Sequence, residues 1–460
     1  MLFLKLMDRL KQYSYLVAVK SLLILLLILL PFPLISSTQD QNQKDFPFPV
    51  SHFKLKNGLQ VILSEDNSLP LVSVVIAYNV GSINELQGKA GLAYLLENLM
   101  FQGSSNVGRM QHISYINRIG GEWNAATTED KTVYYQTVPS NQLALVFWLE
   151  SDRMKNLEIT ESNVHRTKNS IIEEVQHRRA TDPHLESFFA FDRLIFPDFA
   201  HSHPVIGNEK EINDIAVEDV KNFYSTFYVP NNAVLCVVGN VDGERAEELI
   251  RKYFETIPEG KVASSVPVQK SFDKKSASET LKDTLASIPG FHLGYRIAPP
   301  YSRDYYTLKI LEYVLLRGKS SRLYKRLYKR ERLVYDFSAG IEKRKDLAIF
   351  KLFALCNNEI MVDISLRAVL SEINKLKSTL VSEKELTKSK NMFKMDYIKQ
   401  FETSLEKALF LSDTFLSHGT LDVLPLELNK YLNVEARDII SVVNRYFNSD
   451  NRILLTIKIK

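Results

Sequence analysis

The sequence predicts an α+β protein built from two homologous domains, each a mostly antiparallel sheet with helices packed on one face. Short β-like runs alternate with amphipathic helical stretches from Phe46 onward, and one helix–turn–strand unit occurs twice. Hairpin-connected strands with interspersed helices favour this arrangement over a parallel sheet. The 460 residues are too many for one ordinary core and fit two domains of about 200 residues.

The first 37 residues are typical of a secretory signal peptide. Lys5, Arg9, Lys11 and Lys20 surround or precede a short apolar run, Leu22–Ile35, and small polar residues follow it. The run is too short for a permanent membrane anchor to be the preferred interpretation. We therefore expect export, to a bacterial periplasm, with membrane contact only through an uncleaved leader.

The region after the leader begins with a hairpin and continues with alternating strands and helices. Asn57-Gly58 divides the alternating run His52–Leu63 and favours a tight turn between two strands. Further strands are expected at Val72–Tyr78 and Lys131–Pro139. Helical periods are expected at Ala90–Phe101, Arg109–Ile119, Asn141–Leu157, Asn163–Arg179 and Glu218–Phe227.

A repeat at a constant offset of 219 residues connects Asp219–Gly239 with Asp438–Lys458. Each copy reads as a helix, a polar turn and a buried strand, so the alternative is chance similarity between two common units. A duplication predicts domains at residues 46–258 and 281–460. The stretch 259–280, rich in Ser and Lys and without periodicity, is the expected linker.

Charge and cysteine content exclude several classes of function. The net charge is +4, and removing a leader with four basic residues and one acidic residue leaves +1, which gives no basic field for nucleic acid. The only two cysteines, Cys236 and Cys356, cannot form a disulfide framework or a cysteine-based zinc site. Both lie in apolar runs, and we expect buried free thiols rather than a bond between the halves.

The stretch Ala90–Phe101 predicts an amphipathic helix that presents three polar side chains together. Its Leu and Met residues recur at helical spacing on one face. Tyr94, Glu97 and Asn98 fall on the opposite face, at i, i+3 and i+4. The nine histidines of the chain leave an imidazole metal site possible by number, yet none stands on this helix.

The segment GLAYLLENLMFQGS resembles the signature of the insulinase/pitrilysin metallopeptidases, whose inverted zinc motif is His-x-x-Glu-His on such a helix. The resemblance is closest to bacterial, processing-peptidase-like members of half size, and it implies an insulinase-like half as the fold. Further matches cover nearly the whole chain after the leader: Asn57–Val61, Asn79–Asn84, Gly120–Ala125, Trp148–Met154, Val205–Gly207, Tyr228–Ala233 and Ser321–Leu323.

The zinc motif is degenerate in this chain. The resemblance places Tyr94 and Asn98 at the two histidine positions, Glu97 at the general-base position and Glu174 at the third ligand position. A neutral amide and a phenol are poor replacements for two imidazoles, so we expect no zinc, no other cofactor and a non-functional Glu97. Our interpretation is that Tyr94 and Asn98 fill the former metal pocket and hydrogen-bond to Glu97 and Glu174.

Substrate contacts are also implied by the resemblance. In the family an extended peptide adds to the edge strand beside the zinc helix, which here corresponds to Glu122, Trp123, Asn124 and Ala125. Active relatives also hold the scissile carbonyl with an Arg and a Tyr seven residues apart in the second half. Tyr328 stands at the Arg position and Tyr335 at the Tyr position, so this pair is incomplete.

These departures lead to the hypothesis of a catalytically inactive homologue. We expect it to pair, as a heterodimer, with a zinc-bearing paralogous half and to help form the substrate chamber for extended peptides. One alternative is an active metalloendopeptidase with unconventional ligands such as His177, three residues from Glu174. The other is a stand-alone periplasmic protein that binds peptides or acts as a scaffold.

Overall fold

The computed structural model describes residues 48–196, 198–261 and 275–459. The predicted leader and residues 262–274 of the predicted linker lie outside the described residues. Phe46–Lys460 form one compact unit. Within the described ranges, no helix combines the length and the apolar character needed to cross a membrane.

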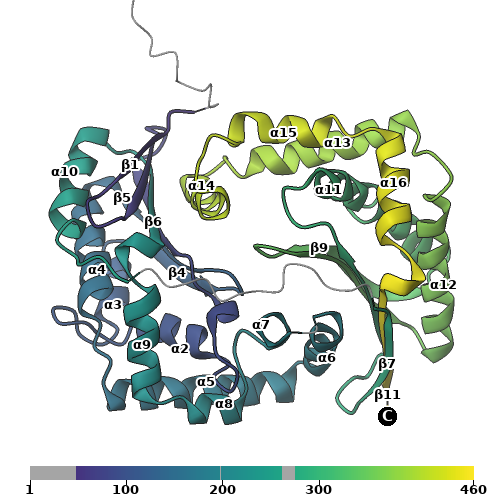
Figure 1. Ribbon diagram of the computed structural model, residues 1–460, viewed down its shortest axis with the longest axis horizontal. Coiled ribbons are helices and arrows are strands. Elements are labelled where there is room, and N and C mark those ends of the chain that lie inside the picture. Colours follow the sequence, from purple (N-terminus) through teal and green to yellow (C-terminus); the bar gives the residue numbers. More distant parts are fainter. Residues whose placement is uncertain (1–47, 197, 262–274, 460) are drawn as a thin grey trace, which may run out of the picture. The chain divides into compact units, whose positions relative to one another are not determined.

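The first sheet has six strands in the order β1-β2-β6-β3-β5-β4 (Figure 1). Its neighbours pair antiparallel, except that β2 and β6 run parallel. The edge strands are β1 and β4. The strands are β1 (Ser51–Lys54), β2 (Gln60–Glu65), β3 (Leu71–Tyr78), β4 (Glu122–Thr127), β5 (Thr132–Pro139) and β6 (Ala233–Gly239).

The second sheet has five strands in the order β7-β11-β8-β10-β9. It repeats the order of the first sheet without β1, and its one parallel pair, β7 with β11, corresponds to β2 with β6. The strands are β7 (Ala277–Asp283), β8 (Gly290–Ile297), β9 (Val334–Lys343), β10 (Ala348–Cys356) and β11 (Arg452–Ile459).

Helices connect and cover these strands. Those of the first half are α2 (Leu92–Leu99), α3 (Gln111–Arg118), α4 (Leu143–Asn156), α5 (Glu161–Thr181), α6 (Leu185–Ile195), α7 (Phe199–Ser202), α8 (Glu209–Asp214), α9 (Val217–Phe227) and α10 (Gly243–Phe254). Those of the second half are α11 (Arg303–Leu315), α12 (Glu359–Lys375), α13 (Glu383–Lys399), α14 (Ser404–His418), α15 (Leu424–Leu432) and α16 (Ala436–Tyr446). Short helical turns are η1 (Ser82–Asn84), η2 (Ser140–Gln142), η3 (Pro230–Asn232), η4 (Tyr324–Arg330) and η5 (Ser449–Asn451).

The repeat is visible in hydrogen bonds as well as in sequence. The side chain of Asn232 donates to the Phe227 carbonyl at 2.8 Å, and that of Asn451 donates to the Tyr446 carbonyl at 2.7 Å. Each of these asparagines follows a helix and precedes a strand, at the predicted offset. The bonds hold the polar turn between helix and strand, which explains why the two asparagines match.

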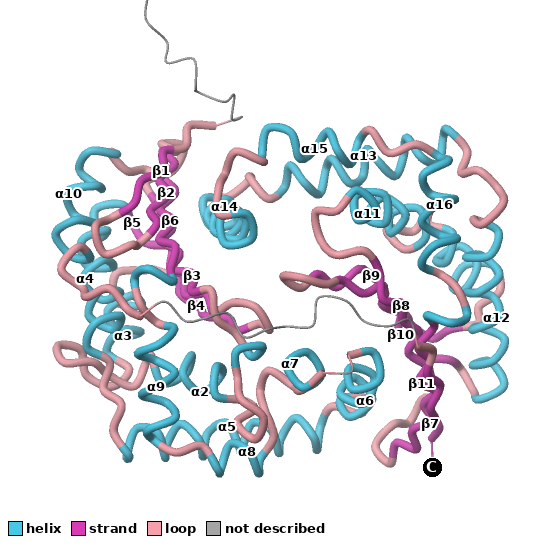
Figure 2. Tube along the Cα trace, in the orientation of Figure 1, coloured by secondary structure: helices cyan, strands magenta, loops and turns pink. Residues whose placement is uncertain are grey.

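Each half contributes one helix to the sheet of the other half. Helix α14 packs Leu411 and Phe415 against Val75 and Cys236 of the first sheet, and α6 packs Ile195 against the second sheet. Figure 2 shows both helices beside these strands. The predicted α+β fold with two similar sheets is therefore confirmed, and this exchange adds cover on a second face of each sheet. The domain boundaries at 258 and 281 stay a prediction.

Candidate functional site

Helix α2, which carries the degenerate motif, is held firmly in the core of the first half. Its leucines at 92, 95, 96 and 99 are buried. At its start, the Glu85 carboxylate accepts hydrogen bonds from the backbone N–H groups of Gly91 (2.9 Å) and Ala93 (2.7 Å). His203 contacts the same carboxylate at 2.9 Å. The position of the motif therefore depends on the core and on a buried carboxylate, because both act on α2 without a metal.

Tyr94 and Glu174 bond directly to each other. The phenol of Tyr94 donates to the two carboxylate oxygens of Glu174, at 3.0 and 3.3 Å. Burial, together with the negative charge of Glu174, raises the pKa of Tyr94 to about 12. The phenol is therefore protonated at neutral pH and acts as a donor to the position that the resemblance assigns to the third metal ligand.

Glu97 faces the edge strand rather than Tyr94 or Asn98. Its carboxylate accepts a hydrogen bond of 2.5 Å from the hydroxyl of Thr127, at the end of β4. Burial raises the pKa of Glu97, and the negative charge of Glu174 adds to this effect while the bonds from Thr127 oppose it. The general-base position thus joins α2 to β4.

Asn98 does not contact Glu97 or Glu174 through any hydrogen bond of the described residues. Its side-chain N–H donates to the carbonyl of Tyr94, one turn earlier on the same helix, at 2.9 Å. Our interpretation is therefore confirmed for Tyr94 with Glu174 and wrong for Asn98. The physical reason is local: a short amide reaches the i−4 carbonyl of its own helix more easily than a side chain on a neighbouring element.

The donor set does not fit zinc. Tyr94 and Asn98 each donate a hydrogen bond to a neighbour. The only anionic oxygen ligands at these positions are therefore the carboxylates of Glu97 and Glu174. His177, the alternative ligand, is exposed on α5. Among the described residues, no group of three or more His, Cys, Asp or Glu side chains is arranged to hold a metal ion.

The predicted substrate edge is an edge strand. β4 pairs with β5 on one side and has no further neighbour in the sheet of the described residues. Trp123 packs against Phe101, with ring centroids 5.1 Å apart. Glu122 and Asn124 are exposed, and the Asn124 side chain accepts a hydrogen bond of 2.9 Å from the backbone N–H of Ala125. An added strand competes with this local bond.

The second-half residues lie on η4 and β9. Tyr328 is 47 % exposed and stacks on Tyr324, and Tyr335 is 63 % exposed. The nearby Arg326 is engaged elsewhere, because it forms ion pairs of 3.0 Å with Glu331 and with Glu372. Arg326 is therefore not a replacement for the arginine that Tyr328 displaces.

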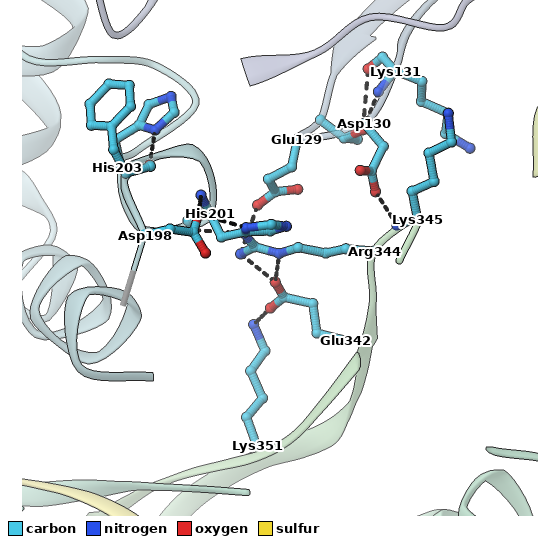
Figure 3. Close-up of polar contacts among 12 residues, drawn as sticks. Glu129, Asp130, Lys131, Asp198, His201, His203, Glu342, Arg344, Lys345 and Lys351 are labelled. Carbon is cyan, nitrogen blue, oxygen red and sulfur yellow. Dashed lines mark hydrogen bonds and ion pairs between the residues drawn. The ribbon is translucent and has the colours of Figure 1, made fainter. Parts of the chain in front are cut away.

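A buried arginine that the sequence did not suggest joins the two halves. Arg344, which follows β9, is 2 % exposed. It donates to the carbonyl of His201 at 2.6 Å and to Glu342 at 2.7 and 2.9 Å, and it lies 3.2 Å from Glu129 (Figure 3). Lys351 completes the cluster through an ion pair with Glu342. Nothing in the local sequence distinguishes Arg344 from a solvated surface residue.

The two cysteines are buried and free, as predicted. Cys236 lies in the centre of β6, and Cys356 ends β10. Burial raises the pKa of both thiols, so neither is a reactive nucleophile.

Comparison with known proteins gives two family models and a set of relatives. Residues 60–190 match the model described as insulinase (peptidase family M16), and residues 214–393 match the model described as peptidase M16 inactive domain. The second match excludes α2, so the word "inactive" in that description does not concern the motif helix.

The bacterial proteins that the chain resembles include some of similar length and one about twice as long. The chain is 27% identical to the zinc protease PqqE of Helicobacter pylori, over 88% of this chain and 91% of the relative. The crystal structure of a protease from the same species superposes with a TM-score of 0.85 at 26% identity, covering 89% of this chain and all of the other. The periplasmic protease PqqL from Escherichia coli gives a TM-score of 0.72 at 17% identity, covering 90% of this chain but 48% of that one.

Proposed function

Because the chain belongs to the insulinase (M16) family of metallopeptidases, we propose that it is an exported, catalytically inactive member that forms the non-catalytic half of a peptidase complex. In this role it binds extended peptides and helps to enclose them, while a zinc-bearing paralogous half cuts them. It has no zinc of its own under this proposal.

The observation that carries the proposal is the bonding at the three metal-ligand positions. Tyr94 donates a hydrogen bond to Glu174, and Asn98 donates one to the backbone of its own helix. Zinc in proteins requires lone pairs from about three strong ligands, usually imidazole, thiolate or carboxylate. Here Tyr94 presents a hydrogen instead of a lone pair, and Asn98 offers only a neutral amide oxygen, which is a weak ligand for zinc. Without a metal, Glu97 has no polarised water to deprotonate, which supports the loss of hydrolysis.

The length relationship supports a role as one half. The chain spans nearly all of the Helicobacter pylori relative and about half of the Escherichia coli protease PqqL, so the latter is about two such units long. Tyr328 in place of an arginine points the same way, because a half that does not cut needs no residue to hold the scissile carbonyl. Export is supported by the leader-like residues 1–37 and by the periplasmic location of the Escherichia coli protease PqqL.

Peptide binding by a half without zinc is supported by β4. The backbone of an edge strand offers N–H and C=O groups to an added strand, and these bonds need no metal. Trp123 is half-buried beside this edge and offers an apolar surface to a neighbouring side chain. Under this proposal, peptide binding therefore does not depend on the lost catalytic chemistry.

The decisive experiment is metal analysis of the purified full-length protein, before and after incubation with excess zinc. We expect far less than one zinc per chain and no hydrolysis of a quenched fluorescent peptide. The matched variant Tyr94→His/Asn98→His rebuilds the His-x-x-Glu-His pattern with Glu174 in place, and we expect it to retain about one zinc per chain. Stoichiometric zinc in the unaltered protein would overturn the proposal of an inactive half.

The complex is tested separately by affinity purification from the native host, followed by mass spectrometry. We expect a co-purifying paralogue that carries an intact His-x-x-Glu-His helix. Recovery of the chain alone, as a monomer or as a homo-oligomer, would refute the heteromeric role and leave a stand-alone peptide-binding protein. Mass analysis of the mature N-terminus tests the leader in the same preparation.

A further inference from the structure

A cavity away from α2 lies between α6 and the second sheet. Its volume is about 390 Å³. Phe188, Phe191 and Asp192 of α6 form one side, and residues of β8, β9 and β10 form the other. Because β9 is an edge strand, the cavity opens beside backbone that another strand can reach.

Aromatic rings form the apolar part of the wall. His292 and Phe353 stack at 4.5 Å, and Phe188 contacts these two rings at 4.8 and 4.9 Å. Burial lowers the pKa of His292 to about 3, so this ring is neutral. Phe188 is 36 % exposed, which is unusual for a phenylalanine that contacts two aromatic rings. Such a surface suits an apolar stem and, over the ring face, a cation.

One carboxylate that lines the cavity has no ion-pair partner among the described residues. Glu342 is paired with Arg344 and with Lys351, and Arg344 is also paired with Glu129. Asp192 takes part in no side-chain hydrogen bond or ion pair of the described residues, although it lines the cavity. Among the charged residues that line the cavity, Lys351 pairs with Glu342, so the carboxylate without an ion-pair partner in the described residues is that of Asp192.

We propose that this cavity binds the basic side chain, lysine or arginine, of a bound peptide, with Asp192 as the partner of its cation and Phe188 and Phe353 along its stem. The proposal rests on the proposed function of peptide binding and names a specificity site for it. A strand added to β9 directs alternate side chains to the face that α6 covers, which delivers a side chain to the cavity. A peptide N-terminus offers the same cation without the stem that the aromatic wall accommodates.

The site has a predictable pH dependence. Burial raises the pKa of Asp192 to about 7, with the negative charge of Glu342 adding to this effect and nearby cations opposing it. Lysine and arginine stay charged in this range, so only the loss of the carboxylate charge weakens binding as the pH falls. We expect affinity to drop about tenfold from pH 8 to pH 6. The charged or titratable groups that face Asp192 from other elements are Glu342, Arg344, Lys351, His292 and Glu129.

The test uses N-acetylated alanine–serine peptides that differ at one position, which holds Lys, Arg, norleucine or Glu. Binding to the full-length protein is measured by calorimetry. We expect the Lys and Arg peptides to bind about tenfold more tightly than the norleucine peptide. Asp192→Asn removes this preference and its pH dependence, while Asp336→Asn, at an exposed carboxylate on the edge strand β9, retains both.

Other outcomes decide against the proposal. Equal binding of the Lys and norleucine peptides overturns it, and so does a preference that persists in Asp192→Asn. If a norleucine peptide with a free N-terminus binds as tightly as the acetylated Lys peptide, the ligand is the terminal ammonium and not a side chain. Phe188→Ala provides a second variant in case Asp192→Asn does not fold, and it weakens the Lys and norleucine peptides alike.

This result is independent of the zinc measurement. A lysine preference in a protein that holds stoichiometric zinc supports the cavity and refutes only the proposal of an inactive half. Peptide binding without the preference, in a zinc-free protein, refutes only the cavity.

Discussion

Replacing Arg344 by methionine removes the guanidinium that connects three segments of the chain. These are the turn after β4 through Glu129, the segment after α6 through the carbonyl of His201, and the end of β9 through Glu342. The guanidinium also lies 3.9 Å from the ring centroid of Phe196. Methionine retains part of the stem but none of the five donors, so two carboxylates and a carbonyl lose a partner.

The expected cost is large because Arg344 itself is buried, with 2 % of its surface exposed. Removing one member of a buried ion pair costs about 3–5 kcal/mol of unfolding free energy, since the remaining charge stays buried. An unfolding entropy of about 2.1 cal/mol/K per residue gives about 0.8 kcal/mol/K for about 400 ordered residues, so the melting temperature falls by about 4–6 °C. Differential scanning calorimetry measures this shift directly.

Two variants control for the prediction. Lys345→Met changes the adjacent residue, whose ammonium makes an exposed 3.2 Å contact with Asn79, and we expect a shift of less than about 1 °C. Arg344→Lys retains the charge but lacks the planar fork that contacts Glu342 and His201 together, and we expect an intermediate loss. A melting temperature of Arg344→Met equal to that of the unaltered protein refutes the reasoning that this cluster stabilises the fold.

Three further predictions concern burial, backbone strain and acid. The thiols of Cys236 and Cys356 will not react with Ellman's reagent until the protein is unfolded, because both are buried and burial raises the pKa of each; release of either in the native state contradicts this. Gly207→Ala will lower the free energy of unfolding in urea by more than about 2 kcal/mol, because φ is +78° and an added Cβ lies 2.4 Å from the Ala90 carbonyl oxygen. Burial raises the pKa of Glu342, but Arg344 and Lys351 outweigh this and hold it below its usual value of 4.5. The stabilisation from Glu342 is therefore present above about pH 4.5 and is lost as the pH falls through the lower folded-state pKa, so the urea midpoint will fall between about pH 5 and pH 3, and by less in Arg344→Met.

Helices and strands whose apolar residues recur at a regular spacing could be predicted from the sequence. The strand expected at Val72–Tyr78 is β3, Leu71–Tyr78, and the helix expected at Asn163–Arg179 is α5, Glu161–Thr181. The hairpin at Asn57-Gly58 also forms, with Gly58 at a positive φ of 87°. Each of these elements is determined by residues that are close in sequence, and hydrophobic periodicity and turn residues report on such local structure.

The partners of individual side chains could not be predicted in the same way. The Tyr94–Glu174 bond was expected because the family resemblance places both residues around one metal position. The bond from Asn98 to its own helix depends on a rotamer choice that no pattern encodes. Arg344 meets the carbonyl of His201, which is 143 residues away in sequence, and Asp192 of α6 meets residues of β9 and β10, so their roles appear only when α6 lies on the second sheet.

The arrangement around α2 holds the edge strand β4 in place through contacts that need no metal. In a metal site the ligands hold their helices together, so losing two ligands removes stabilising contacts. Here Tyr94 joins α2 to α5 through Glu174, and Glu97 joins α2 to β4 through Thr127. Glu85 fixes the start of the same helix independently. Helices α2 and α5 and the edge strand β4 are thus joined without a metal, and this makes the proposed non-catalytic, peptide-binding half physically consistent with the replaced motif.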